Sequence, residues 1–196
     1  MKKEIVSGLF FVSIVIANVI ANRLVLLGGL VLPGAFVLYA VTFLCTDILS
    51  ELYGKKYATS VVWMGFGFSV LAMVIIKGIG LFASPVFALD VNSAYDIFFA
   101  TNTRIVFGSM LAYLISQNID IGIFQILKNK TNGRHKWLRN NGSTMISQAV
   151  DTFVFIGIAF YGSPGIVSIM ISQYVVKLIV ALVDTPIFYA LTRKEK

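Results

Sequence analysis

Two apolar stretches near the C-terminal end of the chain contain polar side chains that are unusual in such surroundings. These are Gln148 and Asp151 in the first stretch, and Gln173, Lys177 and Asp184 in the second. If both stretches are helical, the members of each group share one helix face. Asp151 then lies about 9 residues, or roughly 14 Å, beyond the start of its helix. That is near the middle of a hydrocarbon layer about 30 Å thick. An ionisable group there costs about 2.5–3.5 kcal/mol and is therefore a functional candidate.

Asp151 and Lys177 are expected to meet. The two stretches are neighbours in the sequence and would run antiparallel, so Lys177 reaches a depth similar to that of Asp151. An ion pair is the least costly way to keep both groups charged in lipid. The alternative is a buried pair that only fixes the register of two helices. The amides of Gln148 and Gln173 at the same level favour a binding site.

The composition indicates that lipid surrounds most of the chain. Hydrophobic residues make up 58% and charged residues 13%, against about 45–50% and about 25% in typical soluble domains. The net charge of +7 would suit nucleic acid, but the basic residues flank apolar runs, as membrane topology requires. Nucleic acid is therefore not an expected partner. The single cysteine, Cys45, excludes an internal disulfide and does not by itself suggest a metal site.

The apolar runs predict six membrane-spanning helices in one domain over residues 1–196. The expected spans run from about Ile5 to Leu27, Leu32 to Leu49, Tyr57 to Ile79, Arg104 to Leu127, Ser143 to Tyr161 and Gly165 to Leu191. Gly28 and Gly29 are expected to form a tight turn, and Pro33 to lie in the first turn of the second helix. The segment from Leu81 to Thr103 is too polar to span and too aromatic for a plain loop, so it is expected to be interfacial or re-entrant. Residues 133–142 are expected to form a charged loop before the fifth span.

The lysines and arginines orient these spans. With the N-terminus inside, only four of the 16 basic residues lie away from inner segments: Arg23, Lys77, Arg104 and Lys177. Because the bias of Lys and Arg sets orientation, we predict an all-α, multi-pass membrane protein with both termini cytoplasmic.

Further polar residues occupy other spans. Gln117 and Asp120 share a face of the fourth helix, and Asp47 lies near the inner end of the second. Arg104, near the outer end of the fourth helix, either snorkels to the interface or contacts the substrate. Glu51 stands four residues before Lys55, and a surface pair between them explains it.

The motifs of common enzyme classes are missing from the sequence. It contains no G-x-x-x-x-G-K-[ST] loop, no H-E-x-x-H, no G-x-S-x-G and no His/Cys cluster. We therefore expect no catalytic residue, no cofactor and no bound metal. A membrane enzyme using Asp47 and Asp120 as an acid/base pair remains an alternative, but polar residues spread over most helices fit a solute pathway better than an enzyme or a channel.

Four segments carry a resemblance to a known family. They are "TDILSELYG", "TRIVFGSMLAYLISQNID", "GRHKWLRNNGSTMISQAVDT" and "SQYVVKLIVALVDTP". In these segments the chain resembles the queuosine precursor transporter family, also called the vitamin uptake transporter (VUT) family, from about Asn18 to Leu191. The resemblance implies a six-helix protein of the prokaryotic inner membrane that imports 7-deazaguanine bases such as preQ0 and preQ1, with queuine as a further candidate.

That ligand class gives the polar residues expected roles. A carboxylate suits the N–H and amino donors of a guanine-like edge, and Gln, Asn, Lys or Arg suits its carbonyl. Asp151 and Gln148 are expected to read this edge, with Gln173 and Lys177 facing them. The residues predicted to bind substrate are Asn18, Asn22, Arg104, Gln117, Gln148, Asp151, Gln173 and Lys177. A deeper tier of carboxylates, Asp47, Asp120 and Asp184, is expected to form an inner gate or a proton relay.

The energy source and the assembly stay open at this stage. One hypothesis is a self-contained secondary carrier or facilitator. The other is a substrate-capture subunit docked onto an ATP-driven module, as in energy-coupling factor transporters, whose binding subunits are also small six-helix proteins. Ala17 and Ala21 have the small-xxx-small spacing of a docking helix. Because many transporters use two related halves and no internal repeat is visible here, a homodimer is a further hypothesis.

Overall fold

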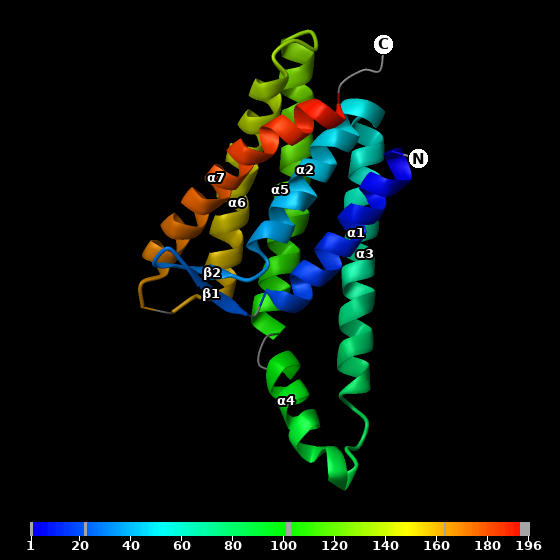
Figure 1. Ribbon diagram of the computed structural model, residues 1–196, viewed down its shortest axis with the longest axis vertical. Helices are drawn as coiled ribbons and strands as arrows, with labels where there is room; N and C mark the ends of the chain where they lie inside the picture. Colours follow the sequence, from blue (N-terminus) through cyan, green and yellow to red (C-terminus); the bar gives the residue numbers. More distant parts are fainter. Residues whose placement is uncertain (1, 22, 101–102, 163, 193–196) are drawn as a thin grey trace.

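Six long helices make up most of the protein, as the sequence predicts. The structure, a computed structural model, describes residues 2–21, 23–100, 103–162 and 164–192. Within these ranges six helices are long and apolar enough to cross a membrane. They are α1 (Lys2–Ile20), α2 (Phe36–Tyr53), α3 (Lys55–Ile79), α5 (Thr103–Lys130), α6 (Lys136–Ala159) and α7 (Ile166–Leu191). They run side by side in one bundle (Figure 1).

A two-stranded hairpin joins α1 to α2. Strands β1 (Leu24–Leu27) and β2 (Leu30–Pro33) pair antiparallel around the turn at Gly28 and Gly29, which was predicted. The φ angles of these glycines, 57° and 84°, suit a tight hairpin turn. The expectation that the first helix continues to Leu27 is wrong, because α1 ends at Ile20. The expectation that Pro33 begins the next helix is also wrong, since it ends β2.

A short helix, α4 (Leu89–Ala100), lies between α3 and α5 after a 3₁₀ turn at Val86–Ala88. It has 12 residues, or roughly 18 Å at 1.5 Å per residue, too short to cross a hydrocarbon layer of about 30 Å. Figure 1 shows it beyond the main bundle, next to the end of α3. The hydroxyl of Tyr95 donates to the carbonyl of Ile76 at 2.6 Å and ties the two helices together.

Helix α6 begins earlier than expected. The fifth span was predicted from Ser143 after a charged loop, yet α6 starts at Lys136 and contains Asn140 and Gly142. Close approach to α5 overrides the poor helix propensity of these residues. A Cβ atom on Gly142 would lie 3.2 Å from the Cδ1 of Leu127 on α5, so glycine allows the two helices to pack tightly here.

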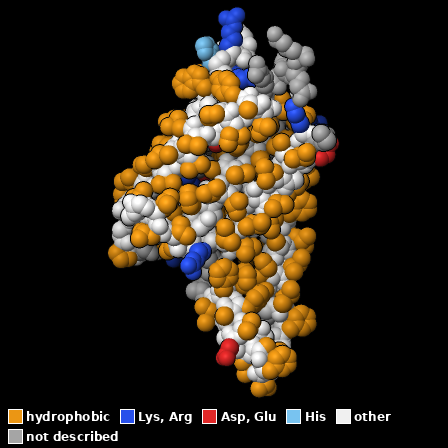
Figure 2. Space-filling view, viewed as in Figure 1, with side chains coloured by type: hydrophobic (Ala, Val, Ile, Leu, Met, Phe, Trp, Pro, Cys, Tyr) orange, Lys and Arg blue, Asp and Glu red, His pale blue; other side chains and the backbone are white. Residues whose placement is uncertain are grey.

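The starts and ends of the helices place both described termini at the same end of the bundle, which we call the basic end. The Lys3 ammonium lies 4.0 Å from the centre of the Tyr57 ring at the start of α3. The Lys136 ammonium donates to the Thr192 carbonyl at 2.9 Å, next to the end of α7. Figure 2 shows Lys and Arg side chains gathered at this end and hydrophobic side chains over the flanks. A cytoplasmic location for the basic end stays a prediction from the charge bias.

Small residues let α1 pack into the bundle. Ala17 and Ala21 are 0% and 2% exposed and belong to the main apolar core. On α3, a Cβ atom on Gly65 would lie 2.7 Å from the ring of Phe10. The Ala17–Ala21 spacing therefore serves contacts within this chain, which accounts for it without an external partner.

Candidate functional site

The predicted ion pair between α6 and α7 is present. The Lys177 ammonium donates to Asp151 Oδ2 and to Thr152 Oγ1 at 3.3 Å. On the other side, the Ser116 hydroxyl of α5 donates to Asp151 Oδ1 at 3.0 Å. Asp151 and Lys177 are each 5% exposed. Three helices thus hold a salt bridge that lipid and water do not reach.

A small cavity adjoins this salt bridge. Its lining comes from α2, α5, α6 and α7: Tyr39, Ser109, Ala112, Asp151, Phe155, Gln173 and Lys177. Its volume is about 10 Å³, which is room for about one water molecule. The carbonyl oxygen of the Gln173 side chain is buried without a hydrogen-bond donor. The cavity therefore offers a carboxylate, an ammonium and an unused amide oxygen in one place.

Hydroxyl and amide groups form the next layer, toward α1 and α3. The Tyr39 hydroxyl and the Ser109 hydroxyl each donate to Asn18 Oδ1 at 2.9 Å, and these two hydroxyls also contact each other. The Asn18 amide donates to Ser69 Oγ at 3.0 Å. The structure thus brings the predicted residue Asn18 to the cavity through Tyr39. Asn22 lies outside the described residues.

Sequence reasoning missed Tyr39 and Ser109. A signal existed for the serine, because Ser109 and Ser116 stand seven residues apart on the face of α5 that also carries Asp120. No comparable signal existed for Tyr39. Eight tyrosines are spread along the chain, and only the packing of α2 against α5 separates this one from the others.

A second tier of carboxylates lies toward the basic end. Asp47 on α2 accepts from Thr144 Oγ1 at 3.4 Å, and Asp120 on α5 accepts from Ser147 Oγ at 2.8 Å. Thr144 and Ser147 stand three residues apart on α6, so the two carboxyl groups face the same turn of that helix. Asp184 on α7 lies close enough to interact electrostatically with Asp47 and Asp120. The three residues predicted as an inner gate or relay therefore form one cluster.

Gln117 and Gln148 are buried beside the cavity without lining it. Gln117 bridges α5 to α2, since it accepts from Thr46 Oγ1 at 2.9 Å and donates to Thr42 Oγ1 at 3.1 Å. Gln148 is 2% exposed, and its carbonyl oxygen has no donor. The prediction that either amide contacts a ligand stays a prediction. Such a contact would require the glutamine side chain or its helix to move toward the cavity.

Arg104 lies away from the Asp151 site. Its guanidinium donates to the carbonyl of Ile158 at 2.5 Å and to that of Tyr161 at 2.9 Å. These carbonyls stand at the C-terminal end of α6, where helix carbonyls lack partners within the helix. The structure therefore places Arg104 as a cap that joins α5 to α6, and it does not bring this residue to the cavity.

At the basic end, Glu51 forms ion pairs with three cations from other helices. Arg139 donates to both of its carboxylate oxygens, at 3.1 and 2.7 Å. Lys128 lies 3.2 Å and Lys136 3.9 Å from the same carboxylate. The expected surface pair with Lys55 is replaced by these long-range contacts. We call Glu51, Lys128, Lys136 and Arg139 the ionic clamp.

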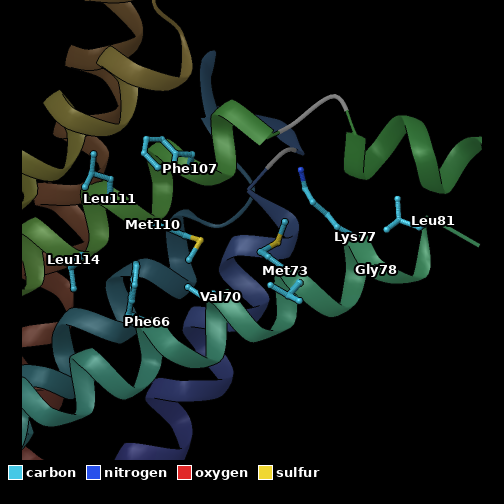
Figure 3. A pocket seen from close by; sticks show the side chains of 11 residues that line it. Phe66, Val70, Met73, Lys77, Gly78, Leu81, Phe107, Met110, Leu111 and Leu114 are labelled. Atoms are coloured by element: carbon cyan, nitrogen blue, oxygen red, sulfur yellow. The ribbon is translucent and has the colours of Figure 1, made fainter.

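The largest cavity described has a different character. It has a volume of about 660 Å³ and lies between α3 and α5. Its lining is apolar apart from Lys77, as Figure 3 shows with Phe66, Met73 and Phe107 among the lining residues. A groove of this composition on the flank of a membrane bundle suits acyl chains, and it contains none of the predicted site residues.

Comparisons with known proteins identify the family. Residues 33–191 match the family model described as "Putative vitamin uptake transporter". A "Probable queuosine precursor transporter" of Bacillus subtilis (strain 168) is 36% identical over 188 residues, which cover 92% of this chain and 82% of the relative. A "Queuosine precursor transporter" of Escherichia coli (strain K12) is 28% identical over 131 residues, 67% of this chain and 56% of the relative. No solved structure matches the chain.

The matched region runs from the end of β2 to the end of α7 and contains the salt bridge, the cavity and the second carboxylate tier. A transporter family with six spanning helices places the protein in a membrane and separates it from the membrane enzymes. The chain belongs to the vitamin uptake transporter family.

Proposed function

We propose that the protein imports 7-deazaguanine precursors of queuosine, such as preQ0, preQ1 or queuine, across a prokaryotic cytoplasmic membrane. The names of the relatives support this substrate class. The observation that carries the proposal is the Asp151–Lys177 pair at a small cavity deep in the bundle. An intramembrane charge pair of this kind commonly marks a substrate or ion pathway.

The chemistry of the cavity complements a deazaguanine base. Such a base presents adjacent N–H and amino donors, which a carboxylate can accept together. Asp151 would receive these donors. Lys177 would donate to the carbonyl of the base, while the unused oxygen of Gln173 would accept a further N–H. The rings of Tyr39 and Phe155 line the same space and supply flat apolar surfaces for stacking.

The structure corresponds to a closed form under this proposal. A cavity of about 10 Å³ holds about one water and excludes a bicyclic base. Binding therefore requires that α2 or α7 moves away from α6. In the closed form the Lys177–Asp151 contact keeps both charges paired. When the base arrives, its polar edge takes over part of this pairing, so neither charge is left alone in an apolar surrounding.

The self-contained carrier is the form of the proposal that we favour. Ala17 and Ala21, whose spacing suggested docking to an ATP-driven module, are buried within the bundle. The homodimer remains a separate proposal with no support from contacts described here.

Reconstituted vesicles test the function directly. Vesicles containing only the purified protein should take up labelled preQ1 or preQ0, and Asp151→Asn should lower uptake strongly at equal protein level. Asp90→Asn, the same chemical change at an exposed position on α4, should import normally. Wild-type import by the Asp151→Asn variant would remove the site assignment. No uptake or binding of any precursor by the wild-type protein would remove the function.

A further inference from the structure

In the part of the chain that the structure describes, the second-tier carboxylates have no cation paired with them, unlike Asp151 and Glu51. Within the described residues, Asp151 pairs with Lys177, and Glu51 pairs with Arg139 and two lysines. Asp47 and Asp120 form no ion pair there, although they are 1% and 0% exposed. Buried carboxylates are ordinarily paired with a cation or neutralised. This pair therefore needs another source of positive charge.

The hydrogen bonds of the pair point to the missing group. Each carboxyl group accepts one hydroxyl: Asp47 Oδ2 from Thr144 and Asp120 Oδ1 from Ser147. The remaining oxygens, Asp47 Oδ1 and Asp120 Oδ2, are buried with no donor. The two hydroxyls stand three residues apart on α6, so the two carboxylates face the same turn of that helix. Two carboxylates placed so close together in a buried cluster cannot both be ionised at low cost. One proton between them would serve as the donor that both lack.

Neighbouring amides show the same excess of acceptors. Asn140 is 1% exposed, lies within hydrogen-bonding reach of Asp184, and has a carbonyl oxygen without a donor. The side-chain oxygen of Gln148 is likewise buried and unpartnered. Because buried polar atoms are nearly always hydrogen-bonded, several orphaned acceptors around one carboxyl pair indicate that the cluster holds added hydrogen-bond donors.

The pair is also next to the substrate cavity. On α5, Ser116 contacts Asp151 and Asp120 follows four residues later. On α6, Ser147 contacts Asp120 and Asp151 follows four residues later. Four residues correspond to about 6 Å along a helix, so one helical turn separates the two tiers. The charged groups nearest the pair are Asp184 on α7, Asp151 and Lys177 one turn away, and Glu51, Lys128 and Arg139 toward the basic end.

We propose that the Asp47–Asp120 pair is a proton-binding site that couples import of the base to inward movement of one proton. The pair alternates between a form that shares one proton, with charge −1, and a form with none, with charge −2. The proton binds from the outer side in the same cycle as the base and leaves toward the basic end. This inference rests on the proposed function and adds that a proton gradient drives the import.

The two charge states explain why movement of the bundle would depend on the proton. With the proton bound, the pair can stay buried, as in this closed structure. Without it, two like charges stand together in a low-dielectric interior with no cation, and access of water relieves the repulsion. The unloaded pair therefore favours a form open to water, and the loaded pair permits closure and reorientation.

Vesicles with an imposed pH gradient, acidic outside, test the coupling. Wild-type protein should accumulate labelled preQ1 up to about tenfold per pH unit if one proton accompanies each base. Asp47→Asn and Asp120→Asn should lose this accumulation yet still exchange internal for external base. The matched control Asp90→Asn should behave as wild type. Full accumulation by both second-tier variants would overturn the proposal, as would accumulation driven by a sodium gradient but not by a pH gradient.

A second measurement does not need the substrate. Infrared spectroscopy distinguishes the carbonyl stretch of a protonated carboxyl from the bands of a carboxylate. At neutral pH the substrate-free wild-type protein and Asp90→Asn should show the band of a protonated carboxyl. The double variant Asp47→Asn/Asp120→Asn should lose the part of this band that the pair contributes, and Asp184→Asn shows separately what the third carboxyl adds. An unchanged band in the double variant, or no band in the wild type, would overturn the proton site. Failure of preQ1 and preQ0 to bind, with the band present, would instead overturn only the proposed function.

Discussion

Glu51 and Asp151 are both carboxylates held by cations from other helices, but Glu51 is partly buried and Asp151 is buried, and they differ in their unused hydrogen-bonding capacity. Glu51 receives two bonds from Arg139 and lies near two lysines. Arg139 in turn donates to the carbonyls of Gly133 and Arg134 at 3.0 Å each. Asp151 has one ammonium and one serine, next to a cavity and an amide oxygen without a donor.

The difference separates a structural ion pair from a candidate binding site. The carboxylate and the guanidinium of the ionic clamp are occupied by each other and by neighbouring carbonyls, and no cavity described in the structure adjoins them. The Asp151–Lys177 pair keeps spare hydrogen-bonding capacity and an adjoining space. Residue type and burial are therefore not sufficient to recognise a site, whereas incomplete satisfaction of buried polar groups is a better guide.

The largest expected effect comes from the clamp. Arg139→Met leaves Glu51 and two carbonyls without their main donor, and breaking a buried ion pair from one side costs about 3–5 kcal/mol. Unfolding in detergent should show this loss in the free energy of unfolding. The matched control is Lys136→Met, whose side chain is 27% exposed and 3.9 Å from Glu51. It should cost under about 1 kcal/mol. Equal losses in the two variants would contradict the described clamp.

Removing the whole Asp151–Lys177 pair should separate stability from binding. Asp151→Asn alone leaves Lys177 buried without its partner, so stability and preQ1 binding both fall. The double variant Asp151→Asn/Lys177→Met removes the unpaired charge, and replacing a buried pair by uncharged groups is often neutral in stability. Calorimetry should then find near wild-type unfolding together with lost binding. Restored binding in the double variant would make this pair structural, like the clamp.

Removing the Tyr39 hydroxyl should lower preQ1 affinity by a smaller amount. Tyr39→Phe removes a hydroxyl that donates to Asn18, which costs about 1 kcal/mol, or roughly fivefold in preQ1 affinity. Tyr113→Phe is the matched control, because its hydroxyl donates to the Val62 carbonyl at 2.7 Å and does not line the cavity. It should lower stability by a similar amount and leave the affinity unchanged. Equal affinity losses would remove Tyr39 from the site.

The features that depend on local sequence were predicted correctly. Six spans follow from the length and apolarity of the runs. The meeting of Asp151 with Lys177 follows from the fixed rise of a helix and the antiparallel order of two neighbouring helices. These properties need no knowledge of which faces of distant helices meet.

The features that depend on packing were missed. Glu51 was matched to Lys55, four residues away, but its main partner is Arg139, 88 positions along the chain. Contact with α5 makes Asn140 helical although asparagine is a poor helix former. The cavity contact of Tyr39 depends on how α2 meets three other helices. In each case a tertiary contact overrides a local preference, which no single sequence reveals.

The position of the ionic clamp has a mechanical consequence for the whole bundle. It fastens α2, α5 and α6 at the basic end, and Lys136 also reaches the carbonyl after α7. The opposite end holds the short hairpin (Figure 1) and the cap made by Arg104. While the clamp is closed it would act as a pivot for opening of the opposite end, and helix displacement would grow with distance from it. The helix segments that carry Asp151 and Lys177 would then be displaced further than the segments that carry Asp47 and Asp120, because they lie farther from the clamp.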